Sequence, residues 1–244
     1  MKIIFSDSLR FMISFKRLFG FFAFFFSFSF LAHSFDFKRD FSPSFFLAFG
    51  PMVLVNTDST AESAPSPVMH AGGAGFDFFP ESSFDFQTKV SFFTNYYLWT
   101  GEEAKPAEVE NRTATAISVL LDLCGGKKWI FGKNSISLDG GVGFLFRYGI
   151  LSNGVEESDK NPITGTSAKD DIKDINSDFL DFMNMIYPEI AFSYSRSIFD
   201  GWKAGVESRI YFPLGSLSNG GGFDNMLFSL SFKLNFPCKS QKES

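Results

Sequence analysis

Apolar and polar side chains alternate along most of this chain with a period of two residues, over segments that are longer than ordinary strands. Residues 84–98 carry Phe, Val, Tyr or Leu at most even positions, with Asp85, Gln87 and Lys89 among the residues between them. Successive side chains of a strand point to opposite faces, so the pattern predicts strands with one apolar and one polar face. Eight segments follow it, five clearly and three less regularly: 44–55, 68–79, 84–98, 112–123, 135–148, 182–195, 202–214 and 224–236.

The length and number of these segments predict a closed barrel. Most span 12–15 residues, whereas a mean globular strand has about 5–6 and a membrane-spanning strand needs about 9–11. Eight is the smallest usual number of strands in a membrane barrel, and an even number returns both ends of the chain to one side. We therefore predict an all-β fold, a single eight-stranded antiparallel up-and-down transmembrane β-barrel within residues 35–236, and a short polar periplasmic tail at 237–244.

The first 34 residues have the pattern of an export signal. Four basic residues within the first 17 positions precede an uncharged, Phe-rich stretch at 18–31, and small residues follow at 32–34. This order predicts a signal peptide at 1–34 that is cleaved before Phe35, with an uncleaved membrane anchor as the alternative. Met1 and Met12 both stay open as the start of translation.

The connections between the predicted strands differ in length and charge between the two ends of the barrel. Residues 80–83 and 196–201 are short, and outer-membrane barrels have short periplasmic turns and long outer loops. We therefore place the long connections outside the cell and both mature termini in the periplasm. The extracellular loops are 56–67, 99–111, 149–181 and 215–222, and the charges of 56–67, 100–111 and 151–178 sum to −2, −3 and −4. The remaining periplasmic connection, 124–134, carries Lys127, Lys128 and Lys133.

The charges of the most regular strands lie on the polar face, which we place inside the barrel. Eight strands leave an interior that side chains nearly fill, and an unpaired charge in so narrow a lumen is unfavourable. We therefore expect the five acids and six bases of this face to pair. The predicted lumen-lining charge network consists of Asp85, Lys89, Arg112, Asp122, Asp139, Arg147, Glu189, Lys203, Glu207, Arg209 and Lys233.

A soluble, lipocalin-like ligand-binding barrel is the distant alternative, because it would turn the apolar face inward and leave the same charges in water. Strand length favours the membrane, and so do aromatic residues near both ends of the predicted strands. These aromatic residues are Tyr96, Trp99 and Tyr148 at the outer end, and Tyr194, Trp202 and Phe236 at the inner end.

The last predicted strand ends in Phe232-x-Leu234-x-Phe236, which resembles the C-terminal membrane-insertion signal that the barrel-assembly machinery reads. Over about residues 44–236 the chain resembles the small eight-stranded outer-membrane proteins, namely the OmpW/OprG family and the membrane domain of OmpA. Its Phe-rich, long-looped style is similar to that of small barrels of spirochaetes. The resemblance implies outer-membrane lipid and the barrel-assembly machinery as partners. The OmpW family in particular implies a small hydrophobic solute as cargo.

Two functions fit this architecture. The first is a narrow conduit for small solutes, because the lumen face contains small residues such as Ala114, Ala116 and Gly143 that leave space. The second is a closed structural barrel whose acidic outer loops serve adhesion, with loop 149–181 as the main surface for an extracellular partner. For this loop we expect a solvated, disordered segment rather than a short helix at the membrane surface.

The residues give little indication of catalysis or of a bound cofactor. His70 is the only His after the predicted cleavage site, and no spacing singles out a catalytic partner, so an enzyme is the least favoured alternative. We expect no catalytic residue, metal site or cofactor, and the formal charge of −5 argues against nucleic acid as a partner. Cys124 and Cys238 are predicted at periplasmic strand ends, and their pairing is left open.

Overall fold

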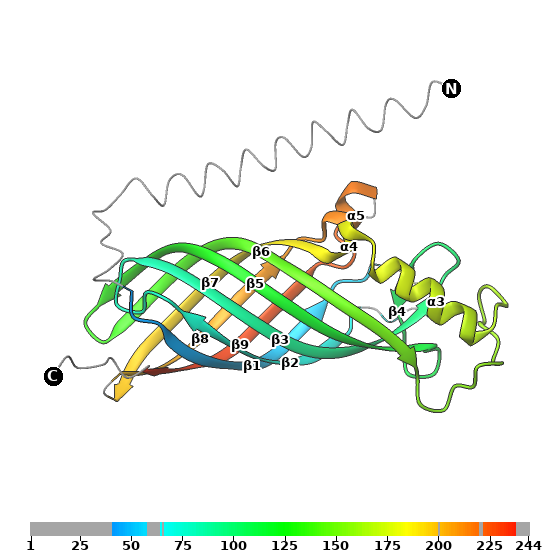
Figure 1. Cartoon of the computed structure of the whole chain (residues 1–244), viewed down its shortest axis with the longest axis horizontal. Coiled ribbons are helices and arrows are strands. Elements are labelled where there is room, and N and C mark those ends of the chain that lie inside the picture. The colour runs from blue at the N-terminus through cyan, green and yellow to red at the C-terminus, as the bar shows by residue number, and fades with distance from the viewer. Residues whose placement is uncertain (1–40, 58–63, 65, 200, 220–221, 238–244) are drawn as a thin grey trace, which may run out of the picture.

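A computed structural model describes residues 41–57, 64, 66–199, 201–219 and 222–237. Nine strands are present in this part of the chain: β1 (Ser44–Leu54), β2 (Val68–Asp77), β3 (Phe84–Trp99), β4 (Ala104–Pro106), β5 (Ala114–Phe131), β6 (Asn134–Leu151), β7 (Ile186–Phe199), β8 (Trp202–Tyr211) and β9 (Leu227–Pro237). All except β4 form one antiparallel ring in the order β2-β1-β9-β8-β7-β6-β5-β3, and pairing of β2 with β3 closes it (Figure 1). The predicted all-β, eight-stranded antiparallel barrel is confirmed.

The ladders of the ring differ in length. β5 and β6 pair along their whole length across a two-residue turn. The first and last strands of the ring, β1 and β9, pair with Ser44 opposite Pro237. The ladder between β2 and β3 is shorter and includes only Gly72 to Asp77 of β2.

Two predictions concern residues that the structure does not describe. The signal peptide predicted at 1–34 and residues 238–244 of the predicted tail lie outside the described residues. Within the part of the chain that is described, no helix is both long enough and apolar enough to cross a membrane.

Each strand of the ring presents an apolar face outward and a mostly polar face inward. Phe49, Phe92 and Phe232 project from the outer wall and are 61%, 57% and 57% exposed. The inward residues between them, such as Ser91 and Lys233, are buried. The alternation in the sequence therefore corresponds to an apolar exterior and a polar interior, as predicted.

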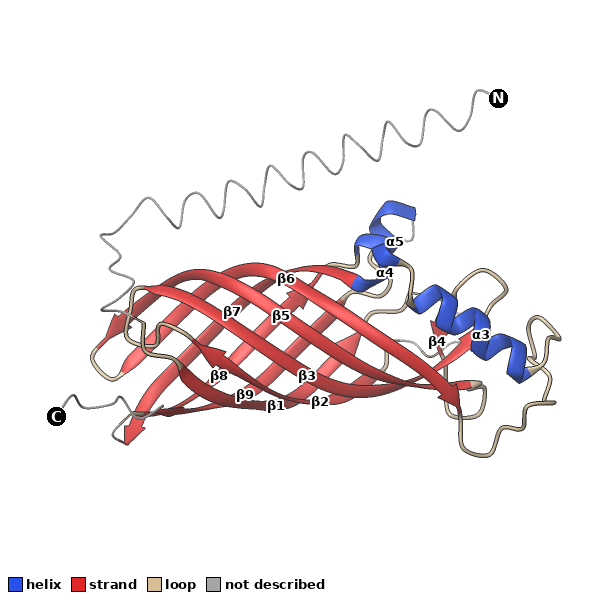
Figure 2. Ribbon diagram, viewed as in Figure 1, coloured by secondary structure: helices blue, strands red, loops and turns tan. Residues whose placement is uncertain are grey.

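Three helices gather at the end of the barrel that carries the long connections, whereas the opposite end has short turns (Figure 2). They are α3 (Ala168–Phe179), α4 (Phe182–Met185) and α5 (Leu214–Asn219). The expectation of a disordered loop at 149–181 is wrong, because Ile175 and Phe179 lie on one face of α3 and are fully buried against the barrel. The strand predicted at 182–195 is shifted by four residues, to Ile186–Phe199, because residues 182–185 form α4.

The bounds predicted for the periplasmic connection, 124–134, are also wrong. β5 continues to Phe131, and the turn to β6 consists only of Gly132 and Lys133. Gly125 and Gly126 lie within β5 rather than in the connection, and a Cβ on Gly126 would overlap the Leu138 carbonyl oxygen of β6. Glycine here permits close approach of two strands.

Gly75 of β2 faces the lumen and lies similarly close to the backbone of β3. This contact gives a prediction for stability. A Cβ on Gly75 would overlap the Thr88 carbonyl oxygen, whereas a Cβ on Gly72 meets only the Phe49 ring, at 3.7 Å. We expect Gly75→Ala to lower the free energy of unfolding by about 1–3 kcal/mol through overpacking. The outward-facing control Gly72→Ala should change it by less than about 0.5 kcal/mol. Urea unfolding in detergent micelles, followed by circular dichroism, measures the stability of both variants. Equal unfolding midpoints for the two variants would contradict the close contact at Gly75.

Candidate functional site: the lumen and its outer cap

Eight of the eleven charged residues predicted for the lumen network project into the lumen and come together in the half nearer the short turns. Both carboxylates and bases are present, and all eight side chains are buried. They are Asp85 and Lys89 of β3, Asp122 of β5, Asp139 of β6, Glu189 of β7, Glu207 and Arg209 of β8, and Lys233 of β9.

Arg209 lies at the centre of this network. Its guanidinium donates to both carboxylate oxygens of Glu207, with Nε–Oε1 2.7 Å and Nη2–Oε2 3.0 Å, and to Glu189 Oε2 at 2.9 Å. Lys89 bridges Glu207 and Asp122, with Nζ–O distances of 3.1 and 3.3 Å. Contacts between charged groups are stronger than neutral hydrogen bonds, so they fix the side chains of four strands relative to one another.

A second group of charges lies closer to the turns. Lys128 Nζ lies 2.9 Å from Asp77 Oδ2 and 3.1 Å from Asp85 Oδ1, and it also donates to the Phe79 carbonyl. Neither Lys128 nor Asp77 belongs to the predicted network. The sequence analysis places Lys128 in the connection 124–134. On the continuous strand β5 it has the same parity as Asp122, and this parity is the signal that would have found it.

The other three predicted residues lie outside the central network. Lys203 is at the turn-side rim, where it contacts Glu81 at 2.8 Å and the Pro80 carbonyl. Arg112 precedes β5 and does not face the lumen; its guanidinium donates to the Val109 and Asn153 carbonyls. Arg147 projects into the half of the barrel beneath the helices, where it meets Phe179 of α3; we call the end that carries the helices the outer end and this half the outer half.

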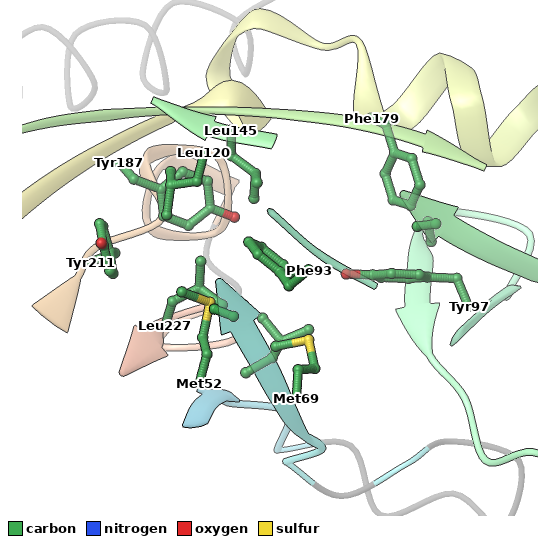
Figure 3. Close-up of a cluster of buried hydrophobic side chains, with 14 of the residues drawn as sticks. Met52, Met69, Phe93, Tyr97, Leu120, Leu145, Phe179, Tyr187, Tyr211 and Leu227 are labelled. Atoms are coloured by element: carbon green, nitrogen blue, oxygen red, sulfur yellow. The ribbon is translucent and has the colours of Figure 1, made fainter. Parts of the chain in front are cut away.

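The outer half of the lumen is filled by an apolar cluster that the sequence analysis did not predict (Figure 3). Tyr211 joins the two halves, because its hydroxyl lies 3.1 Å from Asp122 Oδ2. The missed signal is again parity, since Phe93 shares a strand face with Lys89 and Leu145 shares one with Arg147. The large members of the cluster are Met52, Met69, Phe93, Tyr97, Leu120, Leu145, Phe179, Tyr187, Tyr211 and Leu227.

Helix α3 covers the outer end of this apolar cluster. Phe179 packs edge-on against Tyr97 with ring centroids 4.9 Å apart, and the Arg147 guanidinium lies 4.3 Å from the centre of the Phe179 ring. Asn176 binds the barrel backbone as a strand would, accepting from Gly149 N at 2.8 Å and donating to Gly149 O at 2.9 Å. Burial raises the pKa of Asp178 on this helix above its ordinary value.

The interior leaves little free space near the charges. The cavity between Asp85, Lys128 and Lys233 measures about 20 Å³, which is the room for a single water molecule. A larger cavity of about 310 Å³ lies at the outer mouth and is lined by Arg147 and by carboxylates of the loops. The arrangement is therefore suited to holding the wall rigid and to presenting a structured outer surface.

The residues considered for chemistry do not form a site. His70 faces outward, with its ring stacked 6.1 Å from that of Phe49. Cys124 is buried inside the lumen, 3.4 Å from Arg209 Nη1, rather than at a strand end as predicted, and Cys238 lies outside the described residues. Within the described ranges, no group of three or more metal-ligating side chains comes together.

Removing the central cation should expose the dependence of the barrel on this network. Arg209→Met leaves Glu207 and Glu189 without their main partner in the buried lumen, so we expect a loss of about 3–5 kcal/mol in the free energy of unfolding. Urea titration in micelles measures it. The matched control is Lys169→Met, which removes an ion pair with Glu157 in water at 2.8 Å, and little change is expected there. Equal effects of the two substitutions would argue against a structural role for the network.

The fold and the site together define a closed eight-stranded β-barrel with an apolar exterior, a paired-charge lumen and a helical outer cap. Among solved structures it is similar to Neisserial surface protein A, with a TM-score of 0.43, 7% identity, and coverage of 80% of this chain and 96% of that chain. It is also similar to Ail, the attachment invasion locus protein of Yersinia pestis, with a TM-score of 0.42, 6% identity, and coverage of 81% and 98%. A major outer membrane protein from Thermus thermophilus gives a TM-score of 0.35, 10% identity, and coverage of 80% and 99%.

Sequence comparisons add no family. No protein-family model matches the chain, and no curated protein matches it. The resemblances to the OmpW/OprG family, to OmpA and to spirochaete barrels are therefore untested by sequence comparison and stay predictions.

Proposed function

We propose that the protein is an outer-membrane β-barrel with a closed lumen, whose helical cap binds a positively charged extracellular partner. The observation that carries the membrane location is the wall itself, which exposes Phe, Leu, Ile and Val around the ring while the charges are paired inside. In lipid, backbone polar groups must be satisfied within the protein, and a ring of strands meets this requirement wherever its ladders are paired. In water, the same wall would be a large exposed apolar surface.

Aromatic residues support the same location. Tyr148 is exposed toward the capped end of β6, while Trp129 of β5 and Trp202 of β8 lie near the opposite end. Such residues anchor barrels at the two membrane–water boundaries. We place the short turns in the periplasm and the helical cap outside the cell, since outer loops are the longer set in this class of barrel.

Closure of the lumen favours the surface-binding alternative over the conduit. Arg209 and its carboxylates occupy the inner half, the apolar cluster occupies the outer half, and α3 covers the mouth. A conduit would require these three layers to open together. The cap, in contrast, is ordered by packing of Ile175 and Phe179 and presents exposed carboxylates to solvent.

The net charge of the cap indicates the sign of its partner. Exposed acids outnumber exposed bases on the cap, and they come from loops that are distant in sequence. The exposed carboxylates include Glu102, Glu103, Glu108, Glu110, Asp170 and Asp174. Such a surface attracts a basic partner and repels an acidic one.

The membrane location is tested by folding. Residues 35–244 should give a strand-type far-UV circular dichroism spectrum when they are refolded in detergent micelles and not in plain buffer, because only micelles solvate the apolar wall. A folded monomer in plain buffer would overturn the proposal and would favour the soluble lipocalin-like barrel.

The surface role is tested by changing the charge of the cap in both directions. Asp170→Asn with Asp174→Asn should weaken binding of intact cells to a polylysine-coated surface, and Lys169→Gln with Lys173→Gln should strengthen it, both effects fading in high salt. All four residues are exposed on α3, so the barrel should stay folded.

A flux assay on the same chain separates the two functions. Proteoliposomes should show no solute flux, and the cap variants should not change this result. Flux through the wild-type barrel, together with unchanged cell binding by both cap variants, would favour the conduit instead.

A further inference from the structure

The wall of the barrel is unpaired over a short stretch between β2 and β3. Their ladder ends with Gly72 opposite Phe92, although β2 begins four residues before Gly72 and β3 continues beyond Phe92. The same register would place His70 opposite Thr94, and this pair does not form. β4 and the residue after it occupy the edge of β3 from Tyr96 onward, because Ala107 N donates to the Tyr96 carbonyl at 2.9 Å. We call the gap between residues 68–71 of β2 and 93–95 of β3 the window.

A cavity of about 490 Å³ lies at the window, within the range of about 300–1,000 Å³ that small-molecule sites occupy. Its lining includes three consecutive residues of each strand, 68–70 and 94–96. Consecutive strand residues face opposite sides of a sheet, so the cavity is lined from both faces of the wall. On the inner side, Met69 belongs to the apolar lumen cluster (Figure 3).

One polar group inside the window has no partner. Asn95 faces inward and is only 8% exposed, and among the described residues its Nδ2 has no hydrogen-bond acceptor. A buried donor without an acceptor is unfavourable, and an oxygen supplied by a ligand would satisfy it.

The surroundings of the window indicate the chemistry of that ligand. Phe49, Val68 and Phe92 are exposed on the outer wall around it, so an apolar chain can continue from the membrane into the gap. Glu108 also lines the cavity and would repel an ionised carboxylate. A neutral carbonyl attached to an apolar chain fits both conditions.

We propose that the window binds an acyl chain of a membrane lipid, with the ester or amide carbonyl of that lipid accepting a hydrogen bond from Asn95 Nδ2. The chain then lies along Val68 and Tyr96 and reaches Met69 in the lumen cluster. This inference rests on the proposed membrane location, but not on the identity of any extracellular partner.

The test uses the full chain reconstituted in dioleoylphosphatidylcholine vesicles and re-extracted into micelles, with bound lipid counted by native mass spectrometry as lipid is titrated. The wild type should hold one lipid at low lipid concentration. Asn95→Leu removes the donor and should raise the lipid concentration at half occupancy about three- to tenfold. Met69→Trp fills the window and should abolish retention.

The control is Ser118→Ala, which removes another buried group without a partner, on β5 and away from the cavity lining, and which should bind as the wild type does. Absence of a retained lipid in the wild type, or equal retention by Asn95→Leu, would overturn the inference. Circular dichroism of each variant in micelles distinguishes this failure from failure of the membrane proposal, because the former leaves a barrel that is folded in micelles and not in buffer.

Discussion

The structure depends on one constraint: eight strands enclose a lumen that side chains nearly fill, so the charged inward side chains are stabilised mainly by one another. Arg209 meets this constraint most fully, because it pairs with carboxylates from its own strand and from β7. Since both faces of each strand are set by the same alternation, the choice of a charged interior also determines an apolar exterior. Replacing this arrangement by its inverse would require every strand to shift by one residue.

The two halves of the lumen are filled differently, one by ion pairs and the other by apolar side chains. Ion pairs join the strands near the short turns, where Lys89 and Arg209 connect β3, β5, β7 and β8. Apolar packing fills the half beneath the helical cap, where Phe93 and Leu145 belong to the same buried cluster. The cavities that are large enough for a ligand therefore lie at the periphery, at the outer mouth and at the window in the wall.

The sequence predicted the architecture well, because alternation, strand length and loop asymmetry all depend on local spacing. It predicted most of the charged residues of the lumen for the same reason. It missed Lys128 because the Gly125-Gly126 pair resembles a turn when strand contacts are unknown. It also missed the helix α3, whose stability comes from burial of Phe179 against Tyr97, a contact between residues far apart in the chain. The window depends on where a ladder ends, and no residue pattern shows that.

The pairing of β1 with β9 has a consequence for how the chain is made. Ser44 and Pro237 are opposite one another, so the ring joins residues from the two ends of the described chain, whereas β5 and β6 pair across a two-residue turn. Local hairpins form with little loss of loop entropy, and contacts between distant residues form later. The final ladder must therefore wait until the last strand has been synthesised and delivered. A chain that stops before Leu227 would leave two open strand edges, which are ready templates for aggregation.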